Sequence, residues 1–367
     1  MAIRLVWENT AKRDETIQQT SQSLKSGGIV AIPSDTVYEL AADAGHDSAV
    51  MKLTSTMSGS AVLLAPNKDA VSTLFPKMDA ITRRLVDRCW PGPLSLAAKY
   101  DSAAAEKLGL AATARTHFEN AKLIPFRVTG LPLAVETMRQ TAGCLLVNDN
   151  PEAGPILDAD AAESRFGDLL SKIVDAGAVR FPQIATIAHV VDGELQIVRE
   201  GVLSLSRLRR LGSQVIVFVC TGNTCRSPMA EAIFKRMLAD ELKCDPQDLP
   251  DRGYTVLSAG VAALGGQPAT EEAVYAVRKY KGALEDHVSQ GLTPDLIRLA
   301  DKLIVMTRQH KVAIEDRWPD AASKTVTLSR DHDVSDPIGL PLDQYESTAE
   351  EIFRNLKGYV REVIQAS

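Results

Sequence analysis

The run VIVFVCTGNTCRSP, residues 215–228, decides the fold of the C-terminal part of this chain. Its first six residues, 215–220, are apolar and mostly β-branched, which is typical of a buried parallel strand. Gly222 and Asn223 permit unusual backbone angles, and a helix is expected to begin at Ser227-Pro228. This strand–loop–helix order points successive backbone N–H groups and a helix N-terminus into one small concavity, which suits a bound phosphate.

Cys220 and Arg226 give this loop its expected chemistry. The positive field of the loop is expected to favour the thiolate form of Cys220, which is a nucleophile. Arg226 has a planar guanidinium that can hold two phosphoryl oxygens at once. A Cys and an Arg at this spacing arise often by chance, so a buried cysteine beside an unrelated arginine is the alternative. The flanking strand and helix favour the catalytic interpretation.

Strands and helices alternate after this loop. Apolar runs predict strands, and helical spacing predicts helices, the last with a capping-box pattern at Ser347–Glu350. The strands are expected at 255–261, 301–307 and 325–328, and the helices at 227–242, 270–280, 309–318 and 347–363. Such alternation predicts an α/β domain with a four-stranded parallel sheet, in which ligands bind at the carboxyl ends of the strands. Cys220 stands at such an end.

The N-terminal part is predicted to be a mixed α/β domain. Residues 27–44 suggest a strand, a turn and a helix-like segment, and residues 79–98 suggest a helix broken by a Pro-Gly-Pro turn. Residues 184–203 suggest strands joined by an Asp-Gly turn. The polar, basic stretch 205–213 is the best boundary, which gives domains at 1–210 and 214–367.

Composition excludes several classes of protein. The chain is 45% hydrophobic and 24% charged, and it contains no apolar run long enough to cross a bilayer, so we expect no membrane association. Its net charge of −6 argues against a strong, sequence-independent grip on nucleic acid. The N-terminus has no apolar segment of a secretory signal, and the five cysteines do not suggest a disulfide framework. A cytoplasmic protein is expected.

Residues 214–367 resemble the low-molecular-weight protein phosphatases. The resemblance lies in VFVCTGNTCRSPMAEAIF at 217–234, SAGV at 258–261, ADKLIVMTRQHK at 300–311 and the pair Asp336-Pro337. It implies that Cys220 attacks phosphorus, that Arg226 and the loop amides hold the phosphoryl oxygens, and that Asp336 is the general acid and base. It implies neither a metal nor another cofactor. The alternative for Asp336 is a turn aspartate.

The resemblance also implies roles for the rest of the loop. Thr221, Gly222, Asn223, Thr224, Cys225 and Ser227 would line the phosphate site, with Ser227 hydrogen-bonded to the nucleophile, Asn223 stabilising the loop and Pro337 fixing the acid loop. Cys225 would either trap the nucleophile as a reversible disulfide under oxidation or fill space.

The substrate class stays open between two branches of the family. Arsenate reductases of this fold need two further cysteines downstream, and only Cys244 follows the loop. Tyrosine phosphatases tend to have a bulkier aliphatic residue at the position of Thr224, whereas a threonine there resembles the protein-arginine phosphatases. A hydroxyl suits a polar planar guanidinium better than a phenyl ring. Ile338 stands where an aromatic residue is commoner in both branches. Phosphorylated proteins are the expected partners, with phosphoarginine favoured over phosphotyrosine.

Residues 20–205 resemble the YrdC-like threonylcarbamoyl-AMP synthases, which use threonine, bicarbonate and ATP. The resemblance lies in the segments 27–44, 90–96 and 197–203 and in Arg127. Three places depart from the family pattern: Thr56–Ser60 lacks the family's Lys and Arg, Asn148–Pro151 is partly acidic, and Glu39 replaces a glycine. Each lost charged hydrogen bond costs about 1.5–3 kcal/mol of triphosphate binding, so we expect the synthase activity to be lost.

A ligand site in the N-terminal domain would use the residues that remain, which are Ser34, Thr36, Tyr38 and Arg127. Arg127 suits a ligand contact or a surface salt bridge equally well.

The leading hypothesis for the whole chain is a cysteine-dependent protein phosphatase fused to a degenerate YrdC-like domain. The alternatives are a nucleotide- or double-stranded-RNA-binding protein of tRNA modification, and a phosphoresidue-binding module without catalysis.

Overall fold

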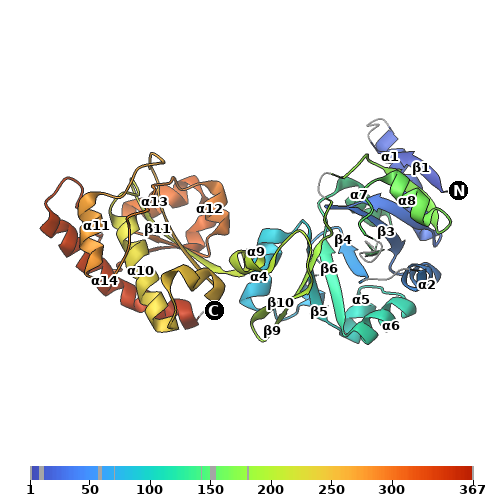
Figure 1. The fold of residues 1–367 in the computed structure, drawn as a ribbon, viewed down its shortest axis with the longest axis horizontal. Helices are drawn as coiled ribbons and strands as arrows, with labels where there is room; N and C mark the ends of the chain where they lie inside the picture. Colours follow the sequence, from blue (N-terminus) through green and yellow to red (C-terminus); the bar gives the residue numbers. More distant parts are fainter. Residues whose placement is uncertain are drawn as a thin grey trace. The chain divides into compact units, whose positions relative to one another are not determined.

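The computed structural model describes residues 2–7, 12–56, 60–69, 71–141, 143–148, 154–179 and 182–365 (Figure 1). The chain forms two compact units, Met1–Leu211 and Gly212–Ser367. Helix α9, Leu205–Gly212, spans the boundary that the sequence suggested at 205–213. Among the described residues, no helix combines the length and the apolar character that crossing a bilayer takes.

The first unit is built on a mixed sheet, as expected. Its described residues form ten strands in the order β1-β8-β2-β3-β7-β4-β6-β5-β9-β10. Parallel and antiparallel pairs alternate irregularly along this order, so the sheet is mixed. The strands are β1 (Ile3–Val6), β2 (Ile29–Pro33), β3 (Tyr38–Asp43), β4 (Val62–Ala65), β5 (Leu94–Lys99), β6 (Leu123–Val128), β7 (Leu145–Asn148), β8 (Leu170–Asp175), β9 (Thr186–Val191) and β10 (Glu194–Arg199).

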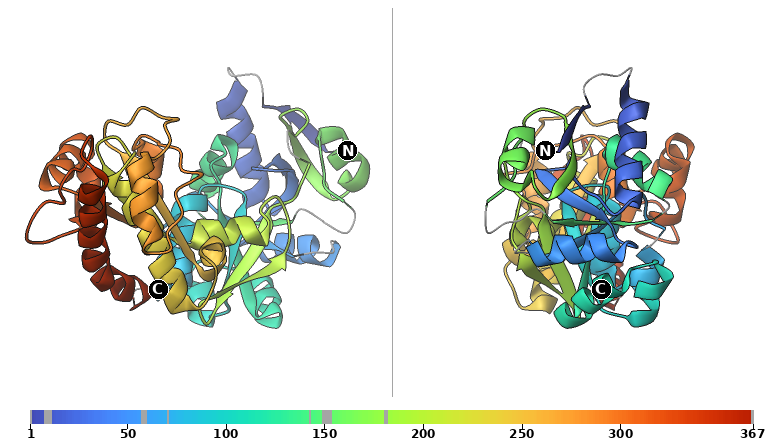
Figure 2. Two further views of the ribbon diagram at one scale, coloured as in Figure 1. Left: turned by 60° about the vertical axis from the view of Figure 1, so that its left-hand side comes forward. Right: turned by 90° about the vertical axis from the view of Figure 1, so that its right-hand side faces the viewer.

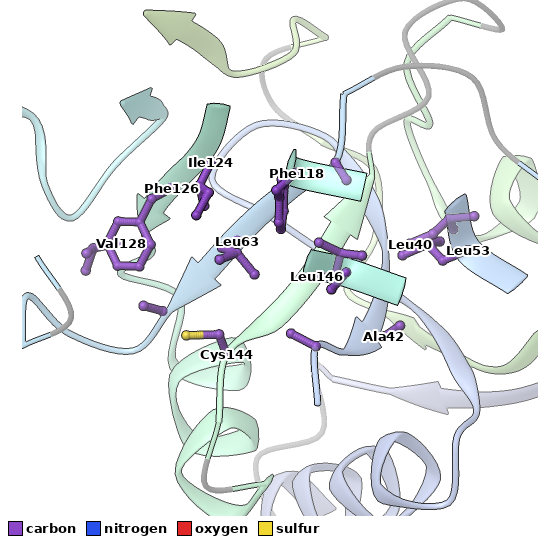
Figure 3. Packing of buried hydrophobic residues seen from close by; sticks show 14 of the residues in the cluster. Leu40, Ala42, Leu53, Leu63, Phe118, Ile124, Phe126, Val128, Cys144 and Leu146 are labelled. Atoms are coloured by element: carbon purple, nitrogen blue, oxygen red, sulfur yellow. The ribbon is translucent and has the colours of Figure 1, made fainter. Parts of the chain in front are cut away.

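Helices cover both faces of this sheet. They are α1 (Arg13–Lys25), α2 (Asp47–Thr56), α3 (Val71–Leu74), α4 (Ala80–Cys89), α5 (Ser102–Lys107), α6 (Ala112–Ala121), α7 (Pro132–Thr141) and α8 (Ala159–Phe166). Helices α1 and α7 pack together over one face (Figure 2). The core on the other face contains Leu40, Leu63, Phe126 and Cys144 (Figure 3). Burial there raises the pKa of the Cys144 thiol to about 11, so this cysteine is a packing residue.

Two predictions for the first unit were wrong in part. The helix-like segment at the end of 27–44 is strand β3, which pairs antiparallel with β2 and β7. Glu, Leu and Ala favour a helix, but residues 38–42 are buried between two neighbouring strands, and this pairing outweighs propensity. The helix at 79–98 ends at Cys89, and the residues after the Pro-Gly-Pro turn form β5. The strands expected around Asp192-Gly193 are confirmed as the β9–β10 hairpin.

The second unit has the predicted four-stranded parallel sheet. Its order is β12-β11-β13-β14, from β11 (Gln214–Cys220), β12 (Tyr254–Gly260), β13 (Lys302–Val305) and β14 (Thr325–Thr327). The helices are α10 (Arg226–Leu242), α11 (Glu271–Arg278), α12 (Pro294–Leu299), α13 (Arg308–Arg317) and α14 (Leu342–Gln365), with short 3₁₀ helices at Pro246–Arg252 and Pro319–Lys324.

The central strand β11 of the second unit is buried on both faces of the sheet. All seven of its residues are buried. Ile216 and Phe218 face the core beneath α10, α11 and α14, whereas Val217 and Val219 face the core beneath α12 and α13. Figure 1 shows these helices on the two sides of β11. A strand apolar on both faces is what a sheet covered by helices on both sides requires.

One prediction for the second unit was wrong. The capping box at Ser347–Glu350 does not start the last helix, because α14 begins at Leu342. The Thr348 hydroxyl donates to the carbonyl of Gln344 at 2.9 Å, one helical turn earlier, so this stretch lies within the helix. A Ser-x-x-Glu pattern can also lie in a helix interior, where hydroxyl side chains donate hydrogen bonds to backbone carbonyls of the preceding turn.

Candidate active site

The phosphate loop follows the carboxyl end of the central strand β11, between strands β12 and β13. Cys220 is 1% exposed at this end. Its Sγ lies 3.0 Å from the Ser227 hydroxyl and accepts the backbone N–H of Asn223 at 3.3 Å. Helix α10 begins at Arg226, so the loop leads directly into a helix N-terminus. The sulfur thus accepts the Asn223 N–H and lies within hydrogen-bond distance of the Ser227 hydroxyl, at the start of the loop that leads into α10.

Asn223 holds the loop in an unusual conformation. Its φ of 58° lies in the left-handed region, whereas Gly222, which was predicted to share that freedom, does not have a positive φ. The Asn223 side-chain amide donates to the hydroxyls of Ser227 at 3.0 Å and Ser258 at 2.8 Å. Its Oδ1 accepts the backbone N–H of Gln290 at 2.8 Å. Asparagine adopts this conformation more readily than most residues, and these bonds fix it there.

Gly260 lets a neighbouring segment approach the loop closely. A Cβ at this position would lie 2.4 Å from the carbonyl oxygen of Thr221. The following N–H groups of Val261 and Ala262 donate to the carbonyls of Cys220 and Thr221, at 2.9 and 3.0 Å. The SAGV segment therefore supports the loop from β12, and only glycine fits at its third position.

Arg226 and Asp336 meet in the site. The Arg226 guanidinium is buried, donates to the Val334 carbonyl at 3.3 Å and forms an ion pair with the Asp336 carboxylate. The Asp336 side chain is 42% exposed, so its carboxylate lies at the surface of the site. The structure thus brings together Arg226 and Asp336 at the end of the loop that begins with Cys220, and the catalytic roles of the three residues stay predictions.

Thr224 and Cys225 differ in what they offer a ligand. The Thr224 hydroxyl has no hydrogen-bond partner among the described residues, and its side chain is half-buried. Cys225 is buried, and its Sγ lies 3.9 Å from Asp336 Oδ1. Burial, and then the charge of Cys220, raise the pKa of the Cys225 thiol to about 11. Cys225 is therefore a thiol at neutral pH, and its disulfide role stays a prediction.

Sequence reasoning missed the residues that brace the loop from a distance. His287 Nε2 lies 2.8 Å from the Asn223 carbonyl, and the imidazole of His310 lies 2.9 Å from the Thr221 hydroxyl. His310 belongs to the segment MTRQHK, which drew attention only as part of a family pattern. Ser258 and Gln290 complete this group. Ser258 likewise stands in a quoted family segment, SAGV, but no local motif assigns these contacts, because they depend on tertiary structure.

The stability of this unit is expected to fall as the solution is acidified. Burial, and then the charge of Arg226, lower the pKa of His310 to about 4, against about 6.5 in an unfolded chain. Between these two pKa values the unfolded chain binds more protons than the folded chain. The contribution of neutral His310 to the free energy of unfolding is therefore complete above pH 6.5 and is lost as the pH falls toward 4. Between pH 7 and pH 5 the loss is about 2 kcal/mol. Denaturant unfolding of the full-length protein at pH 7 and at pH 5 measures this loss. His310→Gln should remove this part of the pH dependence. An unchanged pH dependence in this variant would mean that His310 is not its source.

Tyr38 and Ser34, which were predicted to line an N-terminal ligand site, form hydrogen bonds within the protein. The Tyr38 hydroxyl donates to the Gly177 carbonyl at 2.8 Å and accepts the N–H of Ala176 at 2.9 Å. Ser34 Oγ accepts the N–H of Thr36 at 3.3 Å within the tight β2–β3 turn. Tyr38 therefore serves as a structural residue between β3 and the segment after β8.

Arg127 forms neither a surface salt bridge nor an open cationic site. It is 1% exposed and donates to both oxygens of Glu39, each at 2.6 Å. A buried arginine needs such a partner, because an uncompensated buried charge costs several kcal/mol. The replacement of the family's glycine by Glu39 thus neutralises this cation. Of the other departures, residues 57–59 and 149–151 lie outside the described residues, and Asn148 is buried in β7.

Among the residues that the structure describes, no three His, Cys, Asp or Glu side chains gather as a metal site would require.

Comparisons with known proteins found matches in both units of the chain. Residues 215–367 match the family model for low molecular weight phosphotyrosine protein phosphatase, and residues 22–201 match the Sua5/yciO/yrdC model, described as telomere recombination. A protein-arginine-phosphatase of Bacillus subtilis is 39% identical, over 40% of this chain and 95% of that protein. A probable low molecular weight protein-tyrosine-phosphatase of Ralstonia nicotianae, EpsP, is 34% identical, over 40% and 94%. The solved structure of the YwlE arginine phosphatase of Geobacillus stearothermophilus is 32% identical, over 41% and 94%, with a TM-score of 0.36. The chain, through residues 215–367, belongs to the low molecular weight phosphotyrosine protein phosphatase family.

Proposed function

We propose that the C-terminal unit hydrolyses phosphorylated residues of proteins in two steps. Cys220 Sγ attacks phosphorus, a P–S bond forms, and the bond from phosphorus to the substrate atom breaks as Asp336 gives that atom a proton. Water then attacks the phosphocysteine, Asp336 takes its proton, and the P–S bond breaks to release inorganic phosphate and the thiolate. The observation that carries this proposal is the ion pair between Arg226, at the end of the loop that begins with Cys220, and Asp336 of the acid loop.

The remaining loop residues would bind and orient the phosphoryl group. Arg226 can turn from Asp336 to two phosphoryl oxygens, and the backbone N–H groups from Thr221 to Arg226 would bind the charge that develops on them. Ser227 would hydrogen-bond the sulfur when it leaves as a thiolate, since the two atoms are already 3.0 Å apart. Asn223 would keep the loop rigid, which limits the reorganisation that catalysis costs.

We propose phosphoarginine as the preferred substrate. The Thr224 hydroxyl is free of protein partners among the described residues, so it can bond the guanidinium of a phosphoarginine. A relative named protein-arginine-phosphatase also gives the higher of the two identities, 39% against 34%. The test is phosphate release by the full-length protein from a phosphoarginine peptide and a phosphotyrosine peptide; a clear preference for phosphotyrosine contradicts the proposal.

Thr224→Ile is expected to reverse the preference between these peptides. The larger apolar side chain favours a phenyl ring and leaves the guanidinium without its polar partner. The ratio of kcat/KM for the phosphoarginine peptide to kcat/KM for the phosphotyrosine peptide should fall by about tenfold to a hundredfold, the effect expected for one contact between a side chain and the substrate. Thr224→Ser retains the hydroxyl and is the matched control, which should keep the wild-type ratio. An equal change on both peptides would mean that Thr224 does not set specificity.

For the N-terminal unit we propose that the synthase activity of its relatives is lost. Among the residues that the structure describes, Arg127 is paired with Glu39 and the Tyr38 hydroxyl is bonded to Gly177, so neither side chain is available to hold a triphosphate. Calorimetry of the full-length protein with ATP is expected to detect no binding at millimolar ATP. Micromolar affinity would instead favour the alternative function, binding of nucleotide or double-stranded RNA in tRNA modification.

We also propose a cytoplasmic location, because the five cysteines are all free thiols.

A further inference from the structure

The junction between β13 and α13 contacts both loops of the proposed active site. On the side of the acid loop, the Met306 carbonyl accepts the N–H of Val334 at 2.9 Å, and the backbone N–H of Arg308 donates to the Asp333 carboxylate at 2.8 Å. On the side of the phosphate loop, the imidazole of His310 reaches Thr221. The same short segment therefore fixes the nucleophile loop and the acid loop relative to one another.

The imidazole of His310 lies between two threonine hydroxyls. Its Nδ1 is 2.9 Å from Thr307 Oγ1, and its Nε2 is 2.9 Å from Thr221 Oγ1. His310 is 6% exposed, whereas Thr221, next to the nucleophile, is exposed. Thr307 is also the N-cap of α13, and its oxygen accepts the backbone N–H of His310 at 3.2 Å.

The different exposure of the two threonines favours one position for the ring proton. A neutral imidazole has one N–H donor and one acceptor nitrogen. Among the described residues, each hydroxyl has one acceptor for its own proton, Nδ1 for Thr307 and Nε2 for Thr221, and only one of the two can be used at a time. Thr307 is half-buried whereas Thr221 is exposed, so the Thr221 proton is the one that solvent or a ligand can accept instead. We therefore assign Nδ1 as the acceptor and place the proton on Nε2, which then donates to Thr221 Oγ1. The Thr221 oxygen is bonded by this donor, so its own proton points away from the ring.

We propose that His310 is a positioning residue, which turns the hydroxyl proton of Thr221 outward as a hydrogen-bond donor for an oxygen of the bound phosphoryl group. This inference rests on the proposed function of the same site. A hydroxyl held in one orientation binds an anion better than a freely rotating one, because no rotor entropy is lost on binding. The backbone amides of the loop thus gain a side-chain donor that the phosphate-loop sequence alone does not orient.

The experiment measures the affinity of the full-length protein for inorganic phosphate by calorimetry. Thr221→Val should weaken this affinity about tenfold, because a hydrogen bond to a charged group is lost. His310→Leu should weaken it by a similar factor, and the double variant should bind no more weakly than Thr221→Val alone. A double variant weakened by the product of the two single effects would overturn the proposal, because independent effects multiply.

Two further variants keep the test decisive if His310→Leu does not fold. In His310→Gln the side-chain amide can donate in place of Nε2, so phosphate affinity should return to within about threefold of wild type. His332→Gln makes the same exchange at an exposed histidine that pairs with Glu351 and should leave the affinity unchanged. Wild-type affinity in Thr221→Val, where the exposed side chain does not threaten folding, overturns the proposal whatever the other variants do.

Turnover is recorded separately on an aryl phosphate. The proposal predicts that Thr221→Val and His310→Leu change KM more than kcat, because the phosphate contact exists before the reaction. Phosphate binding does not require turnover. A wild-type protein that binds phosphate without hydrolysing the ester would therefore refute the proposed function alone, and the variant series would still decide the role of His310.

Discussion

Cys220→Ser is expected to lower phosphate release by about 10⁴-fold or more, while the protein still binds inorganic phosphate. The nucleophile is the group for which single replacements in enzymes cost most, of the order of 10⁶-fold in kcat. A serine hydroxyl is not ionised at neutral pH, and the contacts of Cys220 Sγ are the Ser227 hydroxyl and the Asn223 N–H, neither of which is a base. Phosphate binding survives because the loop amides and Arg226 stay in place.

Phosphate release from a phosphoarginine peptide and calorimetry with inorganic phosphate measure the two quantities. Cys244→Ser is the matched control, because it makes the same exchange at a half-buried cysteine beyond the end of α10. This control should keep wild-type turnover. More than about one per cent of residual turnover in Cys220→Ser would exclude Cys220 as the only nucleophile.

The strand–loop–helix of the second unit could be predicted because its signals are local. The strand at 215–220 is apolar without alternation, and β11 is buried on both faces. The helix after it follows from the loop residues and the apolar spacing beyond them. The parallel sheet then followed from alternating strands and helices, which have few arrangements available.

The supports of the site could not be predicted, because they join residues far apart in sequence. Gln290 reaches Asn223 across 67 residues, and His310 reaches Thr221 across 89. A hydrogen bond between side chains leaves no periodic pattern in either segment, unlike burial. The same limit explains Arg127: its partner Glu39 is 88 residues away, and only the tertiary pairing shows that both are buried.

Propensity misled where burial decided the structure. Glu39, Leu40 and Ala41 favour a helix, yet they form β3 because β2 and β7 bond to both of its edges. Such pairing satisfies every backbone group of a buried strand, which is worth more than the few tenths of a kcal/mol per residue that separate helix propensities. The start of α14 was misplaced for a related reason, because a capping box in a helix interior has the same sequence as one at a helix end.

Asp336→Asn is expected to slow the hydrolysis of poor leaving groups by about 10²- to 10⁴-fold and that of good ones by much less. Asparagine has nearly the same shape and can still contact Arg226, but it cannot donate a proton to the leaving atom. A nitrophenolate leaves without help. A tyrosine phenolate, whose conjugate acid has a pKa near 10, needs a proton, and an arginine guanidine, which is a stronger base still, needs one most.

The decisive measurement is therefore the ratio of wild-type to Asp336→Asn kcat for three substrates, which are a nitrophenyl phosphate, a phosphotyrosine peptide and a phosphoarginine peptide. The ratio should increase in this order, because the demand for the proton increases with the basicity of the leaving group. Asp331→Asn, at an exposed aspartate of the same loop, is the matched control and should give ratios near one. Equal ratios on all three substrates would remove Asp336 as the acid and leave it only as the partner of Arg226. An increasing ratio ties the proton transfer to Asp336, whose carboxylate pairs with Arg226 and lies at the surface of the phosphate loop.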